Sequence, residues 1–231
     1  MKHLLNPAAG TNFIYKIITS EDSKFDIRAF NSETLAFSKE TRESKLSIRL
    51  TELEALGFKV EFQRIQSTNL QLNLELIDSQ LPEILAFLVY SKYKNGRSKL
   101  RDLLQDINTA NPLKYNMSKG HPFYEFKIKN FLTENALGMT PEAVWTGKYD
   151  ATGGMIIVKE LGDLVCYHIY NRNEFQDYLM DNTKLEQAST SEDDNNPGFP
   201  KSAKSKPYKF GWVYEDNGEF FIKLNLQIRF T

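Results

Sequence analysis

The residues from Glu219 to Phe230 alternate strictly between two sets of side chains. One set is apolar and takes every second position from Phe220 to Phe230, and the other consists of Phe221, Lys223, Asn225, Gln227 and Arg229. Successive side chains of a strand point to opposite faces, so this period of two predicts a long strand with one apolar and one polar face. The turn residues Asp216-Asn217-Gly218 precede it and predict a hairpin with the segment from Phe210 to Tyr214. The chain must therefore end in antiparallel β-structure.

Further β-structure is expected in the second half of the chain. Two strand-like runs, Met155 to Lys159 and Leu164 to Tyr170, flank Glu160-Leu161-Gly162-Asp163, a turn sequence that predicts another hairpin. Asn173 is the expected N-cap of a short helix that follows. Residues 187–209 hold three prolines, an acidic cluster and several lysines, so we interpret this range as a flexible surface loop.

The middle of the chain has helical rather than alternating spacing. Apolar stripes from Leu81 to Val89 and from Leu100 to Ile107 predict two consecutive helices, the second capped by Ser98. Pro122 and Gly138 frame a third, for which Phe123, Phe126 and Phe131 are expected on one side. Earlier in the chain, a strand is expected at 13–18, a helix from Lys45 to Gly57 and a strand after it, whereas 70–76 fits either state. We therefore predict an α+β fold, a helical middle region with antiparallel β-hairpins in the C-terminal half, forming a single domain over residues 1–231.

Composition restricts the possible environments and partners. The 29 Lys and Arg residues nearly balance the 30 Asp and Glu residues, which argues weakly against a polyanionic partner but leaves room for a local basic surface. One cysteine excludes an internal disulfide, and with only three histidines a zinc cluster of the usual spacing is not expected. The sequence also lacks a signal-peptide pattern and an apolar run of the ~20 residues that span a bilayer. We expect a cytoplasmic protein without membrane contact.

Several segments together resemble one known family. They are Leu4-Leu5-Asn6 with Thr11-Asn12-Phe13-Ile14-Tyr15, Gly120-His121-Pro122-Phe123-Tyr124-Glu125, Ala136 to Pro141, Gly147 to Gly154, Cys166 to Phe175, and Ile222 to Phe230. This pattern, which extends over the whole chain, is similar to that of HpaII-type type II restriction endonucleases. The resemblance implies sequence-specific cleavage of double-stranded DNA, with CCGG as the site and Mg²⁺ as the metal. It also implies a cognate DNA methyltransferase in the same system as a partner. A homodimer is expected because symmetric sites are cut most simply by proteins with two-fold symmetry.

Members of that family have further residues before the segment that matches Leu4-Leu5-Asn6, including a strand with a lysine of the kind that nuclease sites use. We therefore expect this chain to correspond to the C-terminal portion of the family pattern, as an N-terminally truncated member. Three functions follow as alternatives: an active endonuclease, a DNA-binding remnant with an incomplete catalytic site, and a protein-interaction module unrelated to nucleic acid.

Hydrolysis of a phosphodiester with a metal needs hard oxygen ligands and a cation such as lysine near the developing charge. Glu125-Phe126-Lys127 has the Glu-x-Lys spacing of many nuclease strands. The surrounding caps predict a helix instead, in which residues two apart diverge by ~200° and cannot share one metal and one phosphate. We interpret this segment as a surface helix with solvated charges.

A second group is the better catalytic candidate: Asp150 as metal ligand, Lys159 and His168. Asp150 lies before Gly153-Gly154, where the backbone could approach a phosphate, and His168 lies on the neighbouring strand as a possible base. Where a nuclease strand would carry Glu-x-Lys this sequence has His168-Ile169-Tyr170, a departure from the usual assignment. The alternatives are a turn aspartate, a solvated lysine and a buried histidine.

Two sets of polar residues are candidates for DNA contact. Their side chains can read base edges or grip phosphates, and they are Asn171, Arg172 and Asn173 before the short helix, and Lys223, Asn225, Gln227 and Arg229 on the last strand. Helix capping accounts for one asparagine, expected to be Asn173, and leaves Arg172 unexplained. A solvated sheet face is the alternative for the second set.

Overall fold

A computed structural model of the chain describes residues 3–5, 11–19, 25–148, 154–158, 164–168, 171–186, 192–193, 196–200 and 211–230. The helices in these ranges are α1 (Ile27–Thr41), α2 (Lys45–Ala55), α3 (Thr68–Ile77), α4 (Leu81–Asn95), α5 (Leu100–Ala110), α6 (Phe123–Ala136) and α7 (Arg172–Asp181). The strands are β1 (His3–Leu5), β2 (Asn12–Ile18), β3 (Lys59–Ile65), β4 (Gly154–Val158), β5 (Leu164–His168), β6 (Thr183–Glu186), β7 (Glu192–Asp193), β8 (Asn196–Pro200), β9 (Val213–Asp216), β10 (Glu219–Asn225) and β11 (Gln227–Phe230). The expected α+β class, with most strands in the C-terminal half, is confirmed.

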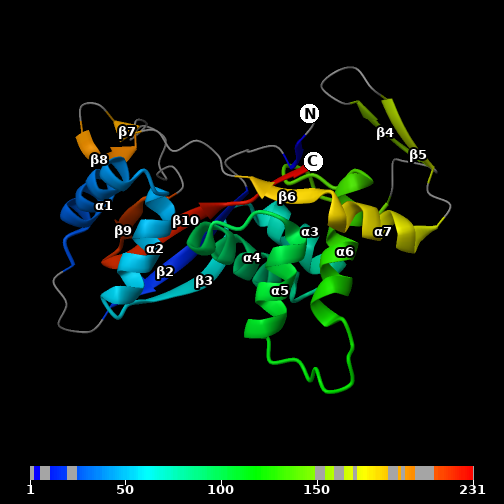
Figure 1. Cartoon of the computed structure of the whole chain (residues 1–231), viewed down its shortest axis with the longest axis horizontal. Helices are drawn as coiled ribbons and strands as arrows, with labels where there is room; N and C mark the ends of the chain where they lie inside the picture. Colours follow the sequence, from blue (N-terminus) through cyan, green and yellow to red (C-terminus); the bar gives the residue numbers. More distant parts are fainter. Residues whose placement is uncertain are drawn as a thin grey trace.

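Strands from the two ends of the chain pair with each other. The larger sheet has the order β3-β2-β10-β9, and the second has the order β1-β11-β6, with all neighbours antiparallel. Figure 1 shows these strands running through the molecule, with both termini near β6. Because β2 pairs with β10 and β1 with β11, the N-terminal strands are part of the same sheets as the C-terminal strands.

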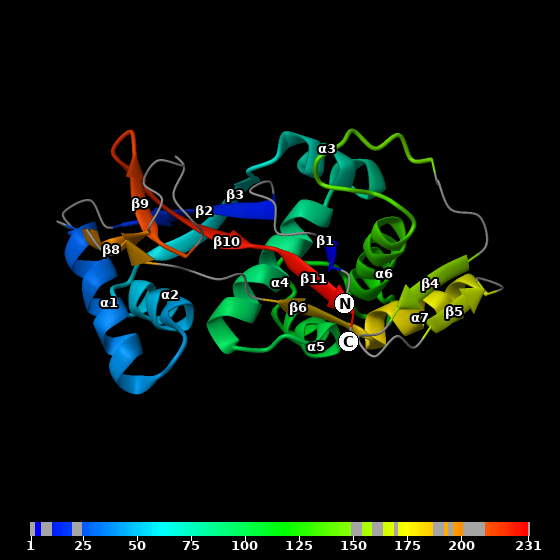
Figure 2. The same ribbon diagram turned by 90° about the horizontal axis from the view of Figure 1, so that it is seen from above.

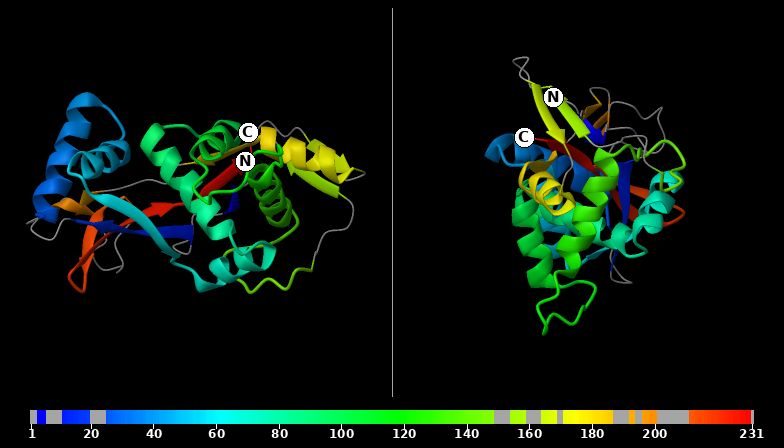
Figure 3. Two further views of the ribbon diagram at one scale, coloured as in Figure 1. Left: turned by 90° about the horizontal axis from the view of Figure 1, so that it is seen from below. Right: turned by 90° about the vertical axis from the view of Figure 1, so that its right-hand side faces the viewer.

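The helices bury their apolar stripes between and beside these sheets. Helix α4 lies centrally, and most of its residues from Leu81 to Tyr93 are buried. Figures 2 and 3 show α1 and α2 with β2, β3 and β9 at one end of the molecule, and α3 to α7 at the other. The apolar stripe of α5 is buried as expected, and the ambiguous segment 70–76 is helical, as part of α3.

The predicted C-terminal strand is interrupted, and its expected polar face is not open. It divides at Leu226 into β10 and β11, which belong to different sheets, because the Leu226 backbone N–H donates to the Thr11 carbonyl at 3.0 Å. Lys223, Asn225 and Gln227 are all buried, with exposed fractions of 1%, 4% and 5%. The expectation of a solvated face was wrong at these three positions, since the fold covers both sides of the strand.

Three local expectations need correction. Lys99, not Ser98, is the N-cap of α5, because the Lys99 carbonyl accepts the first helical hydrogen bonds, from the backbone N–H groups of Asp102 and Leu103 at 3.1 and 3.2 Å. Phe126 does not join the buried side of α6, where it is 61% exposed while Phe131 is buried. Asn171, not Asn173, caps α7, because the Asn171 side chain accepts hydrogen bonds from the backbone N–H groups of the first turn.

Both predicted hairpins of the second half are present. Strands β4 and β5 pair antiparallel from Gly154 opposite His168 to Val158 opposite Leu164. Strands β9 and β10 pair around the turn at Asn217, which adopts the left-handed conformation. The range 187–209 contains the paired strands β7 and β8, with β8 beside α1, and its other residues lie outside the described ranges.

Candidate functional site

A surface pocket of about 370 Å³ opens where α3, α6 and the start of α7 meet the segment that leads toward β4. Its lining combines aromatic, amide and charged side chains: Leu76, Ile77, Asn130, Glu134, Trp145, Thr146, Gly147 and Arg172. One of these, Arg172, was predicted to contact DNA. The pocket is therefore the part of the described structure that unites a predicted site residue with a cavity.

Asn73 holds the loop wall of the pocket in place. Its side-chain amide donates to the carbonyls of Thr140 and Ala143 at 3.1 and 2.8 Å, and its Oδ1 accepts from the Trp145 backbone N–H at 2.9 Å. These bonds replace the regular secondary structure that this loop lacks. They fix Trp145 at the rim, where its ring is partly buried against the core.

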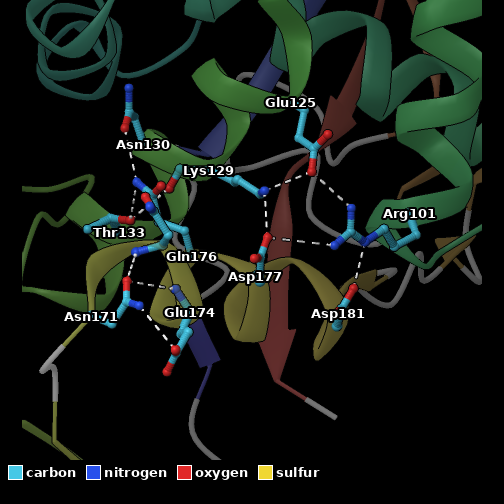
Figure 4. Close-up of polar contacts among 11 residues, drawn as sticks. Arg101, Glu125, Lys129, Asn130, Thr133, Asn171, Glu174, Gln176, Asp177 and Asp181 are labelled. Carbon is cyan, nitrogen blue, oxygen red and sulfur yellow. Dashed lines mark hydrogen bonds and ion pairs between the residues drawn. The ribbon is translucent and has the colours of Figure 1, made fainter. Parts of the chain in front are cut away.

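The start of α7 forms the opposite wall. The Arg172 guanidinium, which is exposed, donates to Asn130 Oδ1 at 3.4 Å, and Gln176 Nε2 donates to the same oxygen at 3.1 Å. Asn171 uses its Oδ1 to cap the helix and its Nδ2 to reach Glu174 at 3.0 Å, so its side chain is engaged within the protein. Figure 4 shows these contacts between α6 and α7. Of the three residues 171–173, Arg172 is the one that lines the pocket, while Asn173 is exposed on the first turn.

A network of charges fixes α7 against α5 and α6 beside the pocket (Figure 4). Arg101 binds Asp181 at 2.6 Å and Glu125 at 3.0 Å, and Lys129 binds Glu125 at 2.8 Å and Asp177 at 2.6 Å. The hydrogen bond from Lys129, helped by Arg101, lowers the pKa of Glu125. The expectation that the charges of this helix are simply solvated was wrong for Glu125, because it pairs with Arg101 and Lys129, and both of these cations also bind aspartates of α7.

Glu125 and Lys127 do not form a nuclease pair. Both lie on α6, as predicted, and their side chains have different partners: Lys127 forms an ion pair with Asp78 at the end of α3. Helical divergence of residues two apart thus explains why this Glu-x-Lys spacing carries no metal-binding geometry.

The predicted catalytic residues are placed only in part. Asp150 and Lys159 lie outside the described residues, and His168 is the last residue of β5, where its backbone is opposite Gly154. In the sequence, Asp150 follows the pocket residue Gly147 by three positions and precedes β4. The chain thus connects the pocket wall directly to the hairpin that carries His168.

The residues predicted to form the polar face of the last strand mostly make contacts inside the protein. Lys223 Nζ donates to Gln66 Oε1 at 3.1 Å and lies over the Tyr214 ring, while Asn225 Nδ2 donates to Thr11 Oγ1 at 2.9 Å. Burial and the nearby Arg64 lower the pKa of Lys223 to about 8, against the opposing effect of Asp216. Arg229 is 31% exposed and pairs with Glu186 at 2.6 Å. Only Arg229 of this set is therefore partly open to a ligand.

The described residues do not assemble a metal site. They contain no group of three or more His, Cys, Asp or Glu side chains that could hold a metal ion. They do not by themselves fit the magnesium ion that the resemblance implies, because Mg²⁺ needs several oxygen ligands around one point. No helix in the described part of the chain is long and apolar enough to cross a membrane.

Sequence reasoning missed most of the pocket. Asn130 and Glu134 lie at an i, i+4 spacing on α6, which places them on one side of the helix, but polar residues at such positions usually face solvent. Trp145 was the available signal, as an aromatic residue in a segment with no expected element.

Comparison with known proteins identifies the family. Residues 1–230 match the family described as HpaII restriction endonuclease. The chain is 43% identical over 227 residues to the type II restriction enzyme HpaII of Haemophilus parainfluenzae, an alignment that covers 98% of this chain and 56% of that protein. This chain therefore spans little more than half the length of that relative, and no solved structure matches it significantly. The chain belongs to the HpaII restriction endonuclease family.

Proposed function

We propose that the chain acts as a type II restriction endonuclease, or as the corresponding part of one, and hydrolyses double-stranded DNA at a specific sequence. The observation that carries this proposal is the 43% identity to the type II restriction enzyme HpaII across 98% of this chain. The CCGG site expected from the resemblance is the sequence to test first.

The pocket beside α7 is the proposed point of DNA contact. Arg172 offers a planar donor to a phosphate or to a guanine edge, Asn130 offers an amide, and Trp145 offers an aromatic surface. The ion pairs of Arg101 and Lys129 hold this wall in place before DNA binds, which reduces the entropy lost on binding.

We place the chemistry at the segment that continues from this pocket into the β4–β5 hairpin. Asp150 would be a metal ligand, Lys159 would steady charge on the phosphate, and His168 would accept or donate a proton. When bound, Mg²⁺ would supply positive charge next to the scissile phosphate. Because the described residues alone do not make a metal site, further ligands must come from residues outside the described ranges or from another chain.

A homodimer is proposed as the active assembly, because a palindromic site such as CCGG is cut most simply by a two-fold symmetric protein. A DNA methyltransferase that protects the same site would be the partner in the cell. Sedimentation of the chain with and without a CCGG duplex tests the dimer, and resistance of a methylated duplex to cleavage supports the second partnership.

A second candidate function is sequence-specific DNA binding without cleavage. It is favoured by one observation, that the described residues hold no cluster of metal-ligating side chains. The two candidates differ in cleavage and agree in binding.

The test is incubation of the purified chain with a CCGG plasmid and Mg²⁺, beside Asp150→Ala, Arg172→Ala and the control Arg42→Ala. Arg42 is an exposed residue just after α1 and lines no part of the pocket. Discrete fragments from the wild type and the control, lost with Asp150→Ala, support an endonuclease. Binding without fragments supports the second candidate, and the absence of both contradicts the two proposals together.

A further inference from the structure

Three cationic residues lie side by side across the sheet β1-β11-β6. Arg229 on β11 is directly opposite Lys184 on β6. On the other edge of β6, Lys184 is directly opposite Lys99, which forms an isolated antiparallel β-bridge with it. Directly opposed residues of an antiparallel pair point to the same face of the sheet. We call Lys99, Lys184 and Arg229 the basic row.

The basic row points away from the core. The residues that alternate with it, Leu185 and Ile228, are 2% and 0% exposed and belong to the main hydrophobic cluster. The basic row therefore lies on the face of the sheet opposite Leu185 and Ile228. Lys99 is exposed, Lys184 is half-buried, and the Arg229 side chain is 31% exposed.

This arrangement has an electrostatic cost within the protein. Like charges directly opposite each other on neighbouring strands repel, and Lys184 has a cation on both sides. The carboxylate of Glu186, on the same face, binds Arg229 at 2.6 Å. In the part of the chain that the structure describes, neither Lys99 nor Lys184 forms an ion pair, so the repulsion between these two is not compensated there.

We infer that the basic row binds the phosphate backbone of double-stranded DNA, an inference that rests on the proposed function. Neighbouring strands are about 4.8 Å apart, so three in register extend over about 10 Å. Phosphates of one B-DNA strand advance about 3.4 Å each along the helix axis and also wind around it, so a row of this length can reach more than one phosphate. The negative charges of the phosphates attract each of these cations and so offset the repulsion between them. The row contacts phosphates rather than bases, so it sets affinity and register and not sequence preference.

The test measures binding of a fluorescent duplex by anisotropy between 50 and 300 mM salt, for the wild type and Lys99→Gln/Lys184→Gln. Each phosphate contact contributes about 0.9 to the slope of log affinity against log salt. We expect the slope of the double variant to fall by about 1 to 2, equally for CCGG and scrambled duplexes. Lys99→Arg/Lys184→Arg should restore the slope because it restores the charges.

A matched control is Lys114→Gln/Lys119→Gln, in the loop between α5 and α6 at the end of those helices remote from β6 (Figure 1). It removes the same charge and should leave the slope near that of the wild type. If the two double variants have equal slopes while the wild type binds DNA, the basic row is not a DNA contact. If the wild type binds no duplex at any salt concentration, the proposed function fails as well, so the two failures differ.

Folding gives an independent readout. Removal of uncompensated like charges should leave the melting temperature of Lys99→Gln/Lys184→Gln unchanged or higher in low salt without DNA. A lower melting temperature would show that the lysines stabilise the fold, which contradicts the inference that their charges are held for a ligand.

Discussion

The guanidinium of Arg49 lies over the ring of Trp212, with its central carbon 4.2 Å from the ring centroid. Arg49 is fully buried on α2 and donates to Thr34 Oγ1 at 3.1 Å, to the Asn31 carbonyl at 3.3 Å and to the Gly211 carbonyl. One side chain therefore joins two helices to the segment that enters β9. A buried charge is tolerated there because the planar group satisfies several acceptors and stacks on an aromatic face.

Replacement of Arg49 by methionine should lower the free energy of unfolding by about 3 kcal/mol, because buried acceptors lose their donors. Urea unfolding of Arg49→Met beside the exposed Arg42→Met measures the difference. Arg42 substitution should change stability by less than about 0.5 kcal/mol. Equal, small effects at both positions would show that the Arg49 contacts do not stabilise the fold.

Glu125 should make the chain more stable at neutral than at acid pH. Its hydrogen bond from Lys129, with Arg101, lowers its pKa in the folded state, so the unfolded chain takes up a proton first as the pH falls. The stabilisation is complete above the unfolded pKa and is lost as the pH falls through the folded pKa. We expect less than about 1 kcal/mol, because the pair is partly exposed. Unfolding of Glu125→Gln at pH 7 and pH 3 should show a smaller acid loss than the wild type, whereas an equal loss contradicts the role of Glu125.

Lys223 should also make stability rise with pH, but in the alkaline range, because the fold disfavours its charged form. Burial first, and then Arg64, lower its pKa to about 8 in the folded chain, below its usual value of about 10.4 when unfolded. Between these two values the unfolded state binds more protons, so stability rises with pH. Below pH 8 the folded chain bears the full free-energy cost of the buried Lys223 ammonium. Relative to Lys223→Met, the wild type should gain up to about 3 kcal/mol as the pH rises from 7.5 to 10.5.

The control for Lys223 is Lys59→Met, an exposed lysine at the start of β3 in the same sheet. The free energy of unfolding of Lys59→Met should change with pH in the same way as that of the wild type over this range. A parallel course for Lys223→Met would mean that the Lys223 ammonium is as well solvated when folded as when unfolded.

Local patterns predicted the elements better than the contacts between them. The spacing of Leu100, Leu103, Leu104 and Ile107 was enough for α5, because an amphipathic stripe fixes both the helix and its buried side. The division of the last strand at Leu226 could not be seen, because it depends on a hydrogen bond to Thr11, more than two hundred positions earlier. The burial of Lys223 and Asn225 has the same origin, since alternation shows that two faces differ and not what covers each of them.

At the candidate site too, local patterns did not predict the contacts between segments that are remote in sequence. Arg172 was identified from its residue type, whereas the pocket beside it is assembled from α3, α6 and the loop held by Asn73. Arg229 was predicted to contact DNA, but its grouping with Lys99 and Lys184 was missed, because the three residues are remote in sequence and meet only through strand register. Capping at Asn171 rather than Asn173 was a choice between two chemically equal residues, which only the backbone could decide.

The most direct test of the central claim, that this chain recognises a specific sequence in double-stranded DNA, is a competition measurement. A labelled CCGG duplex bound to the chain is displaced by unlabelled CCGG duplex or by a duplex of the same composition in scrambled order, at fixed salt without added metal. The account predicts that the CCGG competitor displaces the label at a concentration at least about 1,000-fold lower than the scrambled one, as specific binding requires. Equal displacement by the two competitors, or no binding at all, would contradict it.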